Sequence, residues 1–338
     1  MTKIVFFDAD NFDKKFLNAA FDGKFDIEYV ENSLNDMTEL TDKQKQAQII
    51  SCFTTSRVSK EVLEKFPNLK LIALRSVGFN HIDTDYCKEH GIAVETTPNY
   101  GNMTVAEFAY ALLLDVARRV TSTYMFMRNT DIIPRNTTGI ELFGKTIGIV
   151  GLGKIGAESA RIAFGFGMKI LGYDKYQRDD LKEKYGVQYV DFETLIKNSD
   201  FITLHTPATK DNYHLFDEKA FNKMKQNAII VNTARGELID TQALYNALKN
   251  KVIRGAGLDV LESEETMENR DYLNDIDRLN TKSLQNTIFN DRLLRLNNAI
   301  ITPHIAYDTQ EAIERILSTT VENINEFVQG RTQNNVIV

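Results

Sequence analysis

The chain has 338 residues and a formal net charge of −7, with 43% hydrophobic and 26% charged residues. This composition is typical of a globular protein, and the length predicts two domains rather than one. The negative charge, with no basic stripe to offset phosphates, argues against nucleic acid and against an anionic membrane surface as partners. No apolar run approaches the roughly 20 residues that span a bilayer, and the N-terminal run is too short for a signal peptide.

The sequence contains two cysteines, Cys52 and Cys87, in segments that are typical of strands or helices. Their spacing fits no metal-ligand motif, so we expect no metal site. Free thiols persist in reducing compartments, whereas secreted proteins tend to pair them. We therefore expect both cysteines to be buried and reduced, in a cytoplasmic protein.

Short apolar runs alternate with amphipathic stretches from end to end, which is the pattern of parallel α/β sheets. The first series of predicted strands comprises residues 3–7, 26–30, 48–52, 70–74 and 92–95. The second series comprises residues 146–150, 169–173, 201–205, 228–232, 255–260 and 299–302. The pattern predicts an α/β fold built on parallel sheets.

Three further segments carry expectations of their own. A long helix is predicted over residues 105–120, because Thr104 and Glu107 have the spacing of a capping box. Residues 264–298, rich in Asn, Asp and Glu with scattered Leu, are expected to form an irregular insertion ahead of the last strand. Residues 309–330 are expected to form a final helix, because their apolar positions recur at spacings of three and four.

A glycine-rich turn, Gly-Leu-Gly-Lys-Ile-Gly, directly follows the predicted strand 146–150. In this pattern the first glycine makes a tight turn, the second lets a pyrophosphate approach, and the third lets helix and strand pack closely. The helix that starts here would offer its N–H groups and positive dipole end to the phosphates. The context predicts a dinucleotide site, and a glycine turn that only packs tightly is the alternative. Its expected residues are Gly151, Gly153, Lys154, Ile155 and Gly156.

An acidic residue, Asp174, stands where the next predicted strand ends, about 20 residues beyond the turn. A carboxylate at this place accepts hydrogen bonds from the adenosine ribose and repels a 2′-phosphate. Asp174 therefore favours NAD over NADP, and a simple solvated strand end is the alternative.

Chemically active side chains follow three later strands, at the sheet edge where open α/β sheets bind ligands. Arg235 has a planar fork that suits a carboxylate, although a surface ion pair explains such an arginine equally well. Asp259, Glu262 and Glu264 crowd the end of another strand, where a solvated acidic loop is the ordinary alternative. His304 follows the last strand.

Reduction of a ketone needs a proton donor that titrates near neutrality, and histidine is the natural choice among the five that the chain contains. His90 precedes a glycine and is expected beside a helix C-cap. His81 and His214 lie in polar surroundings that predict exposure, and His205 ends a strand where it is a candidate for nucleotide contact. His304 alone stands at a strand end beside a proline, which favours a catalytic role as much as a structural one.

Five pieces of the sequence, in this order, resemble the D-2-hydroxyacid dehydrogenase family over nearly the whole chain. They are Arg75-Ser76-Val77-Gly78, the glycine turn with Asp174, Asn232-Thr233-Ala234-Arg235-Gly236, Gly257-Leu258-Asp259-Val260 with Glu264, and Thr302-Pro303-His304. Several motifs at matching separations are more specific than any one of them. Within the family the chain is most similar to D-lactate dehydrogenases, including the vancomycin-resistance type, through residues 261–265, the long segment after them and residues 304–307.

The resemblance implies two doubly wound parallel-sheet domains, Rossmann-like or flavodoxin-like, with the active site in the cleft between them. Residues 1–100 plus 304–338 would form the substrate domain, and residues 101–303 the NAD-binding domain. The helix over residues 105–120 would be part of a homodimer interface.

The resemblance also implies roles for single residues. The backbone amides of Val77 and Gly78, with Arg235, would hold the substrate carboxylate. His304 would be the general acid in reduction, and Glu264 would pair with it and raise its pKa. The residues that match nucleotide-lining positions are Thr206, Pro207, Asn212, Thr233, Ala234 and Asp259, the last of them near the nicotinamide amide.

One departure from the family pattern concerns the glutamate. Many relatives have proline directly after it, whereas Glu265 follows Glu264 here, and Glu262 lies nearby. The choice of Glu264 therefore rests on its spacing from Asp259. A formate dehydrogenase of the same fold is one alternative for this chain. Those enzymes have glutamine where Glu264 stands, which argues against it.

The expected substrate is a small 2-keto acid, with pyruvate first and D-lactate as its product. Phe53, Tyr100 and Tyr307 are the candidates for pocket walls, and no Lys or Arg near them marks a phosphorylated substrate. One alternative is a member of the same family that acts on a larger 2-keto acid. Another is an NAD-sensing binding protein without turnover, although such a protein has no need of a proton donor.

Overall fold

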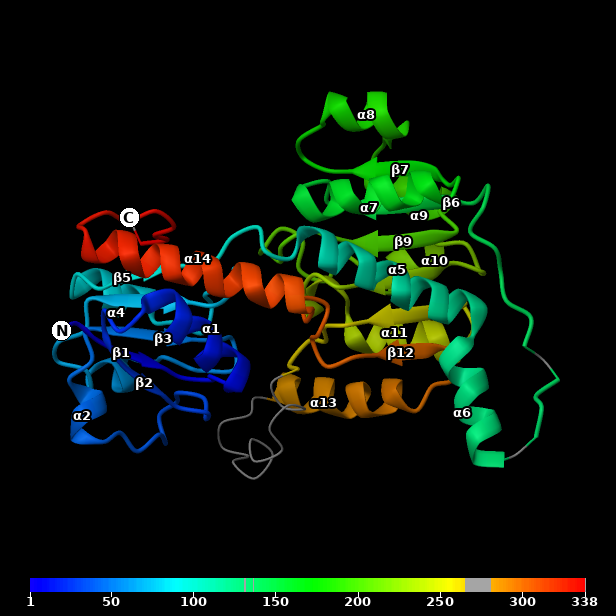
Figure 1. The fold of residues 1–338 in the computed structure, drawn as a ribbon. Coiled ribbons are helices and arrows are strands. Elements are labelled where there is room, and N and C mark those ends of the chain that lie inside the picture. Colours follow the sequence, from blue (N-terminus) through cyan, green and yellow to red (C-terminus); the bar gives the residue numbers. More distant parts are fainter. Residues whose placement is uncertain (131, 136, 265–280, 338) are drawn as a thin grey trace. The chain divides into compact units, whose positions relative to one another are not determined.

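The computed structural model describes residues 1–130, 132–135, 137–264 and 281–337. The chain divides into two compact units, each with its own parallel sheet (Figure 1). The first unit comprises Met1–Tyr100 and Thr309–Val338, and the second comprises Gly101–Asp308. The chain thus leaves the second unit after Asp308 and not after residue 303, so His304 belongs to the unit that carries the glycine turn.

The sheet of the first unit has five parallel strands in the order β2-β1-β3-β4-β5, the flavodoxin-like order. Most of its strands are buried on both faces, which explains why they read as continuous apolar runs. The bounds of the strands are β1 (Lys3–Phe6), β2 (Asp26–Tyr29), β3 (Ile49–Cys52), β4 (Leu71–Leu74) and β5 (Ala93–Glu95).

Helices cover both faces of this first sheet and form two apolar cores with it. They are α1 (Asn11–Phe21), α2 (Asp42–Lys45), α3 (Lys60–Leu63), α4 (Thr84–Glu89) and α14 (Gln310–Val328). The final helix starts where expected, because Thr309 caps it by accepting from the Ala312 N–H at 3.2 Å. Its apolar stripe packs on the sheet, where Leu317 and Ile324 join the core around Ile4.

The sheet of the second unit has seven parallel strands in the order β12-β11-β10-β9-β6-β7-β8. Counted within the unit this is the order 3-2-1-4-5-6 of a Rossmann fold with one strand added at the edge. The bounds are β6 (Thr146–Val150), β7 (Lys169–Tyr173), β8 (Gln188–Tyr189), β9 (Phe201–Leu204), β10 (Ile229–Asn232), β11 (Gly255–Leu258) and β12 (Ala299–Ile301).

The helices of the second unit also lie on both faces of their sheet and close two apolar cores. Those that precede or follow the first strands are α5 (Asn102–Arg118), α6 (Val120–Thr130), α7 (Lys154–Gly165), α8 (Asp179–Tyr185) and α9 (Phe192–Asn198). The rest are α10 (Glu218–Lys223), the short 3₁₀ helix η1 (Gly236–Leu238), α11 (Thr241–Lys249) and α13 (Thr281–Leu294). Within the described residues no helix is long and apolar enough to cross a membrane.

The predicted α/β fold is confirmed, and each of the predicted strands is present to within about two residues. Two local predictions are wrong. The long helix begins at Asn102 with Gly101 as its N-cap, so Thr104 is buried inside the helix and forms no capping box. The expected irregular insertion contains α13, whose polar side chains contact Glu262 and Ser263 in the segment after β11. Residues 265–280 lie outside the described part.

Candidate active site

The glycine turn lies at the carboxyl end of β6, and its three glycines have different surroundings. Gly151 has φ +88°, and a Cβ built there would lie 2.7 Å from the backbone of His205. A Cβ on Gly156 would lie 2.0 Å from the carbonyl oxygen of Gly151, so only glycine lets α7 start this close to the strand. A Cβ on Gly153 would meet nothing within 4 Å. The turn is therefore tight on its inner side and open on its outer side, as a pyrophosphate requires.

The N-terminus of α7 is suited to an anion. Lys154 and Ile155 begin the helix, Gly153 is its N-cap, and no side chain caps it. The first N–H groups of a helix have no intrahelical acceptor and carry the positive end of its dipole. Because β6 pairs with β7 on one side and β9 on the other, the turn stands where the strand order reverses, which is where doubly wound sheets bind ligands. These residues fit a dinucleotide.

Asp174 follows β7 directly, and the backbone holds its carboxylate beside the turn. The Leu152 N–H donates to Oδ2 at 2.5 Å, and the Tyr176 N–H donates to Oδ1 at 2.8 Å. Each carboxylate oxygen can accept a further hydrogen bond. The half-buried carboxylate is therefore fixed in place and still able to accept from a ribose hydroxyl.

A buried amide shapes the segment after β10. Asn232 accepts from the Ala234 N–H at 3.0 Å and donates to the Arg235 carbonyl at 2.8 Å. The guanidinium of Arg235 donates to the Ala234 carbonyl at 2.7 Å, and no carboxylate of the described residues lies at ion-pair distance from it. The hydroxyl of Thr233 is buried without a hydrogen-bond partner in the same part of the chain. Arg235 is therefore a half-buried cation whose guanidinium pairs with no carboxylate of the described residues.

Asp259 anchors the segment that carries His304. Its carboxylate is only 1% exposed and accepts from the Thr302 hydroxyl at 2.6 Å, the Ile305 N–H at 3.0 Å and the Ala306 N–H at 2.7 Å. Its carbonyl accepts from the His304 N–H at 2.9 Å. These bonds hold His304 at φ +53°, a backbone conformation that few residues other than glycine adopt. The sequence suggested only a position near the nicotinamide for Asp259, and this anchoring was missed.

The structure separates the two glutamates between which the sequence left a choice. Glu264 places Oε1 at 2.8 Å from His304 Nδ1, and its Oε2 accepts from the Leu261 N–H at 3.0 Å. Glu262 points elsewhere, onto Tyr213 and His214. A carboxylate can only accept, so the Nδ1 proton of His304 points at Glu264 and the exchangeable proton is carried by Nε2.

Opposing effects act on the pKa of His304. Burial on its own lowers this pKa, but the hydrogen bond and charge of Glu264, together with the charge of Asp259, raise it above the ordinary value. Arg235 acts in the opposite direction and lowers it in part. The net result is a raised pKa, which keeps the imidazole protonated to higher pH.

The loop after β9 contains three of the residues predicted to line the nucleotide. At its start Thr206 is half-buried and Pro207 is exposed. The side chain of Asn212 accepts from the Thr209 N–H at 2.7 Å and donates to the Pro207 carbonyl at 2.8 Å. Asn212 therefore shapes this loop through both ends of its amide.

In the first unit, Val77 and Gly78 lie in the loop that follows β4. Their backbone N–H groups donate to no group of the described chain, and the side chain of Val77 is 50% exposed. The loop is anchored by Arg75, a buried residue whose guanidinium contacts the Asp13 carboxylate and the Phe7 carbonyl. Arg75 is thus buried and supports a loop in which the backbone N–H groups of Val77 and Gly78 have no acceptor among the described residues.

The three aromatic residues predicted as pocket walls are all half-buried. Phe53 follows β3, and its N–H donates to the Asp8 carboxylate at 3.0 Å. Tyr100 ends the first segment of the first unit, where its carbonyl accepts from Arg315 at 2.7 Å. Tyr307 lies in the second unit, shortly after His304.

The other histidines differ from expectation in part. His90 is itself the C-cap of α4, where the sequence predicted a position beside one. His81 and His214 are half-buried, so the predicted exposure is wrong for both: burial lowers the pKa of His81 to about 4, and His214 contacts Glu262 at 3.0 Å. His205 follows β9 with its Nε2 at 3.0 Å from the Thr203 hydroxyl, and burial lowers its pKa to about 3. His205 is therefore neutral at physiological pH.

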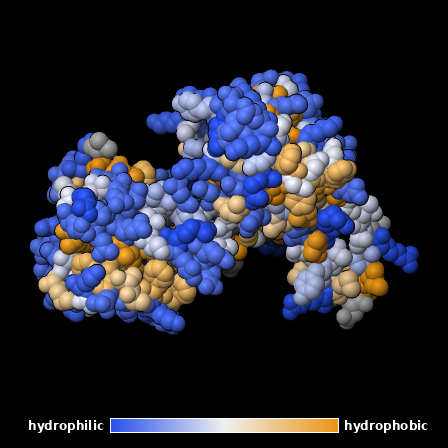
Figure 2. Space-filling model, turned by 45° about the horizontal axis from the view of Figure 1, so that its top comes forward, coloured by the Kyte–Doolittle hydropathy of each residue, from blue (hydrophilic) through white to orange (hydrophobic). Residues whose placement is uncertain are grey.

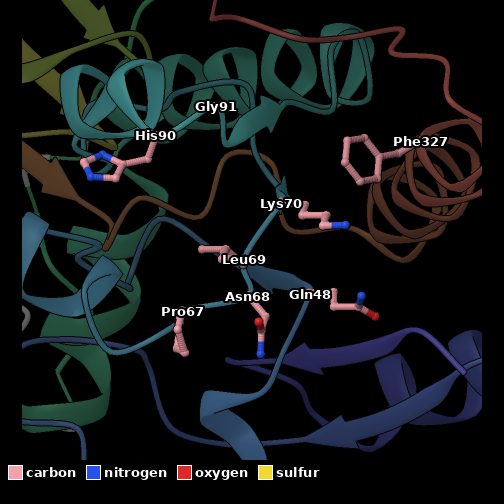
Figure 3. Close-up of a pocket in the computed structure, with 8 residues that line it drawn as sticks. All are labelled: Gln48, Pro67, Asn68, Leu69, Lys70, His90, Gly91 and Phe327. Atoms are coloured by element: carbon pink, nitrogen blue, oxygen red, sulfur yellow. The ribbon is translucent and has the colours of Figure 1, made fainter.

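A surface pocket of about 540 Å³ lies elsewhere, at the amino ends of strands in the first unit (Figure 3). Its lining includes Gln48 and Lys70, which directly precede β3 and β4. Val77 and Gly78 follow the opposite end of β4, so this pocket is separate from their backbone N–H groups.

Comparison with known proteins decides the family. Residues 110–306 match the family described as "D-isomer specific 2-hydroxyacid dehydrogenase, NAD binding domain", a match that covers more than half of the chain and includes Arg235, Glu264 and His304. The chain belongs to this family. It is an NAD-dependent D-2-hydroxyacid dehydrogenase, as the sequence resemblance predicted.

Relatives within the family differ in the substrate that their names state. The chain is 38% identical to the D-lactate dehydrogenase of Escherichia coli, over 99% of this chain and 100% of that protein. It is 39% identical to the glyoxylate reductase of Thermococcus litoralis, over 88% of this chain and 86% of that protein. The solved structure of the D-lactate dehydrogenase of Aquifex aeolicus, complexed with NAD and lactic acid, is similar with a TM-score of 0.84, 35% identity and 99% coverage of both chains.

Proposed function

We propose that the chain catalyses the reduction of pyruvate by NADH to D-lactate, with His304 as the acid–base catalyst. The observation that carries this proposal is the 2.8 Å contact between His304 Nδ1 and Glu264, on the unit that also holds the glycine turn and Arg235. A paired histidine with a raised pKa is what a ketone reductase needs, whereas a cofactor-binding protein without turnover has no use for one.

The reaction needs a hydride, a proton and a fixed substrate. When bound, NADH supplies the hydride to the carbonyl carbon. The imidazolium of His304 donates its Nε2 proton to the carbonyl oxygen, and Glu264 stabilises the charged ring through Nδ1. Arg235 binds the substrate carboxylate through its planar fork, and the amides of Val77 and Gly78 are proposed as further donors. In the reverse direction the neutral ring of His304 accepts the proton of the hydroxyl group.

The remaining site residues are assigned to the cofactor. The turn and the N-terminus of α7 would hold the pyrophosphate, and Asp174 the adenosine ribose. The first unit would then serve as the substrate domain and the second as the NAD-binding domain. The other residues proposed to line the nucleotide are Lys154, Ile155, Thr206, Pro207, Asn212, Thr233, Ala234 and Asp259.

The substitution Asp174→Ala is expected to relax the preference for NADH over NADPH. The carboxylate repels a 2′-phosphate and accepts from the 2′-hydroxyl, so its loss should weaken NADH binding and strengthen NADPH binding. Steady-state kinetics with both cofactors measure the ratio of kcat/KM values, which should fall by about tenfold or more. Asp179→Ala, at an exposed position on α8, is the control. An unchanged ratio in Asp174→Ala would show that the carboxylate does not contact the ribose.

The substitution Glu264→Gln is expected to move the pH dependence of reduction to lower pH. Reduction needs the protonated ring, so its rate is full below the pKa of His304 and declines as pH rises through it. Glutamine removes the negative charge that raises this pKa, so the decline should begin about one pH unit lower. The measurement is kcat for pyruvate reduction from pH 5 to 9 at saturating NADH. A profile that coincides with that of the unmodified protein would contradict the proposed pair.

Pyruvate is proposed as the preferred substrate because the D-lactate dehydrogenase of E. coli aligns with this chain from end to end. Phe53, Tyr100 and Tyr307 are proposed to limit the length of the substrate side chain. A panel of glyoxylate, pyruvate, 2-oxobutanoate and 4-methyl-2-oxopentanoate tests this proposal through kcat/KM. One methylene more or less typically changes kcat/KM by about 10–200-fold, so the optimum should be sharp. A maximum at a longer acid would reassign the substrate, and tight NADH binding without turnover would favour a binding protein.

We further propose that the protein is a cytoplasmic homodimer that uses the α5–α6 region as its interface. The helix α6 has no buried residue, and Val120, Tyr124 and Met127 are 60%, 57% and 45% exposed at spacings that share one helix face. At the lower right of Figure 2, orange and tan residues lie among blue and pale ones on this part of the second unit. An apolar face of this kind usually marks an interface. The two cysteines are buried and free, which fits a reducing compartment.

The dimer proposal predicts that Tyr124→Asp combined with Met127→Asp converts the protein to a monomer. Two carboxylates in an apolar interface lose hydration without gaining partners. Light scattering coupled to size exclusion measures the mass. Asn129→Asp is the matched control, because Asn129 is exposed on the side of α6 opposite Val120. A monomeric unmodified protein would refute the dimer.

A further inference from the structure

The carboxylate of Glu262 is nearly buried, and three side chains hold it. Glu262 is 6% exposed. The Tyr213 hydroxyl donates to its Oε1 at 2.5 Å, Lys282 Nζ lies 3.3 Å from the same oxygen, and His214 Nε2 lies 3.0 Å from Oε2. Lys282 also contacts Tyr213 directly, with its Nζ 4.4 Å from the ring centroid. None of these side chains belongs to the acid–base pair described above.

The partners of Glu262 come from two elements on either side of it. Tyr213 and His214 belong to the loop after β9 that begins with the proposed nucleotide-lining residues. The helix α13 contributes Lys282, Asn286 and Asn290, which share one face because they are four residues apart. Asn290 donates to the Glu262 carbonyl at 3.0 Å, and Asn286 donates to the Ser263 hydroxyl at 3.3 Å. The two residues that precede Glu264 are therefore held both by the loop and by α13.

The backbone at this point turns sharply toward the histidine. Ser263 has φ +60°, a conformation that non-glycine residues keep only where their surroundings hold it. The turn brings the Glu264 carboxylate back onto the Leu261 N–H at 3.0 Å and against His304 at 2.8 Å. The position of Glu264 thus depends on a strained turn over residues 261–264, in which Glu262 is fixed by its own carboxylate.

We propose that Glu262 is a positioning residue for the reaction: by holding the turn over residues 261–264 between the cofactor loop and α13, it places Glu264 against His304. The inference rests on the proposed function only in taking His304 as the proton donor. Glu262 itself contacts neither His304 nor Glu264 through any hydrogen bond of the described residues.

His304 and Glu262 are surrounded by different charged groups, which indicates that Glu262 acts by positioning Glu264 and not by a direct electrostatic effect on His304. His304 is faced by Glu264, Asp259 and Arg235. Glu262 instead faces Tyr213, Lys282 and His214, and the other nitrogen of His214 lies 3.5 Å from Asp240. Loss of Glu262 should therefore reach His304 by releasing Glu264, since a looser contact raises the pKa of His304 less.

The test is the titration of His304 followed by NMR of its ring carbon, which a chain with five histidines allows. The unmodified protein, Glu264→Gln and Glu262→Ala are compared. We expect Glu264→Gln to lower the midpoint by about one pH unit and Glu262→Ala to lower it by a smaller step in the same direction. In Glu262→Ala, kcat for pyruvate reduction should also fall about tenfold, because small misplacements of catalytic groups lower the rate strongly.

Asp291→Asn is the matched control, because Asp291 is exposed on α13 and, among the described residues, pairs with Arg295 alone. Its titration and kcat should equal those of the unmodified protein. If Glu262→Ala does not fold, as judged by circular dichroism, Tyr213→Phe carries the test: it removes only a hydroxyl and should shift the midpoint in the same direction.

Two outcomes would overturn the inference, and they are distinguishable from failure of the proposed function. A folded Glu262→Ala, or Tyr213→Phe in its place, with unchanged midpoint and kcat would show that Glu262 is merely structural, while a shift in Glu264→Gln would leave the acid–base pair intact. If Glu264→Gln also left the midpoint unchanged, the pair itself would be wrong.

Discussion

The substitution His304→Ala is expected to lower kcat for pyruvate reduction by about 10²–10⁴-fold, the usual contribution of general acid catalysis. Alanine removes the imidazole whose Nδ1 lies 2.8 Å from Glu264, and with it the proposed proton donor Nε2. NADH affinity should change little, because the glycine turn and Asp174 lie on other strands of the same sheet. The result should therefore be a large loss of turnover with cofactor binding retained.

Two measurements check the His304→Ala prediction. Steady-state kinetics give kcat, and quenching or enhancement of NADH fluorescence gives the Kd of the cofactor. His90→Ala is the matched control, since His90 is an exposed C-cap residue of α4 in the first unit. A variant that retains turnover within about threefold would remove His304 from the chemistry, because such a change lies far below the range for a general acid.

The substitution Arg235→Lys is expected to raise the KM for pyruvate and to lower kcat, for a combined loss of about 10²–10³-fold in kcat/KM. Lysine keeps the charge but loses the planar fork that binds a carboxylate through two parallel hydrogen bonds. The described structure leaves this fork without a protein carboxylate, with one donor on the Ala234 carbonyl. The remaining donors are the ones proposed for the substrate.

Arg235→Ala extends this test, because it removes the charge as well and should lose more activity than lysine does. Arg295→Lys is the matched control: Arg295 is exposed and pairs with Asp291 on α13. Added guanidinium should restore part of the activity of Arg235→Ala and none of the activity of His304→Ala. Wild-type kinetics for Arg235→Lys would contradict the proposed clamp.

The fold was largely predictable because parallel strands covered on both faces are continuous apolar runs. β1, β3 and β4 are examples, and each was predicted to within a residue. The two-residue strand β8 was missed because it is too short and too polar to give such a run. The start of α5 was placed too late because Thr104 has a capping residue's chemistry, yet the chain enters the helix earlier, at Gly101, and buries Thr104.

The site was predictable where a residue's own chemistry or its place at a strand end points to a role. The glycine turn, Asp174, Arg235 and His304 were singled out as candidates in this way, and their roles remain proposals. The contacts that these residues make were harder to predict from the sequence. The choice of Glu264 over Glu262 depends on which carboxylate reaches across about 40 residues of sequence to His304, and only the folded chain shows that contact at 2.8 Å.

The support of the site was missed for the same reason. Asp259 binds Thr302 and two backbone N–H groups beyond it, a set that no local pattern connects. Glu262 is held by residues on both sides of it in the sequence, Tyr213 and Lys282. Long-range pairs of this kind define the geometry of the proposed acid–base group, whereas the sequence motifs indicate only which residues belong to it.

The identity of the product formed from pyruvate and NADH tests the proposed reaction most directly. The purified protein is incubated with both compounds, and the lactate is resolved on a chiral column while NADH consumption is followed. We predict D-lactate in an amount equal to the NADH consumed. Formation of L-lactate, or tight binding of NADH with no loss of pyruvate, would contradict the proposed function.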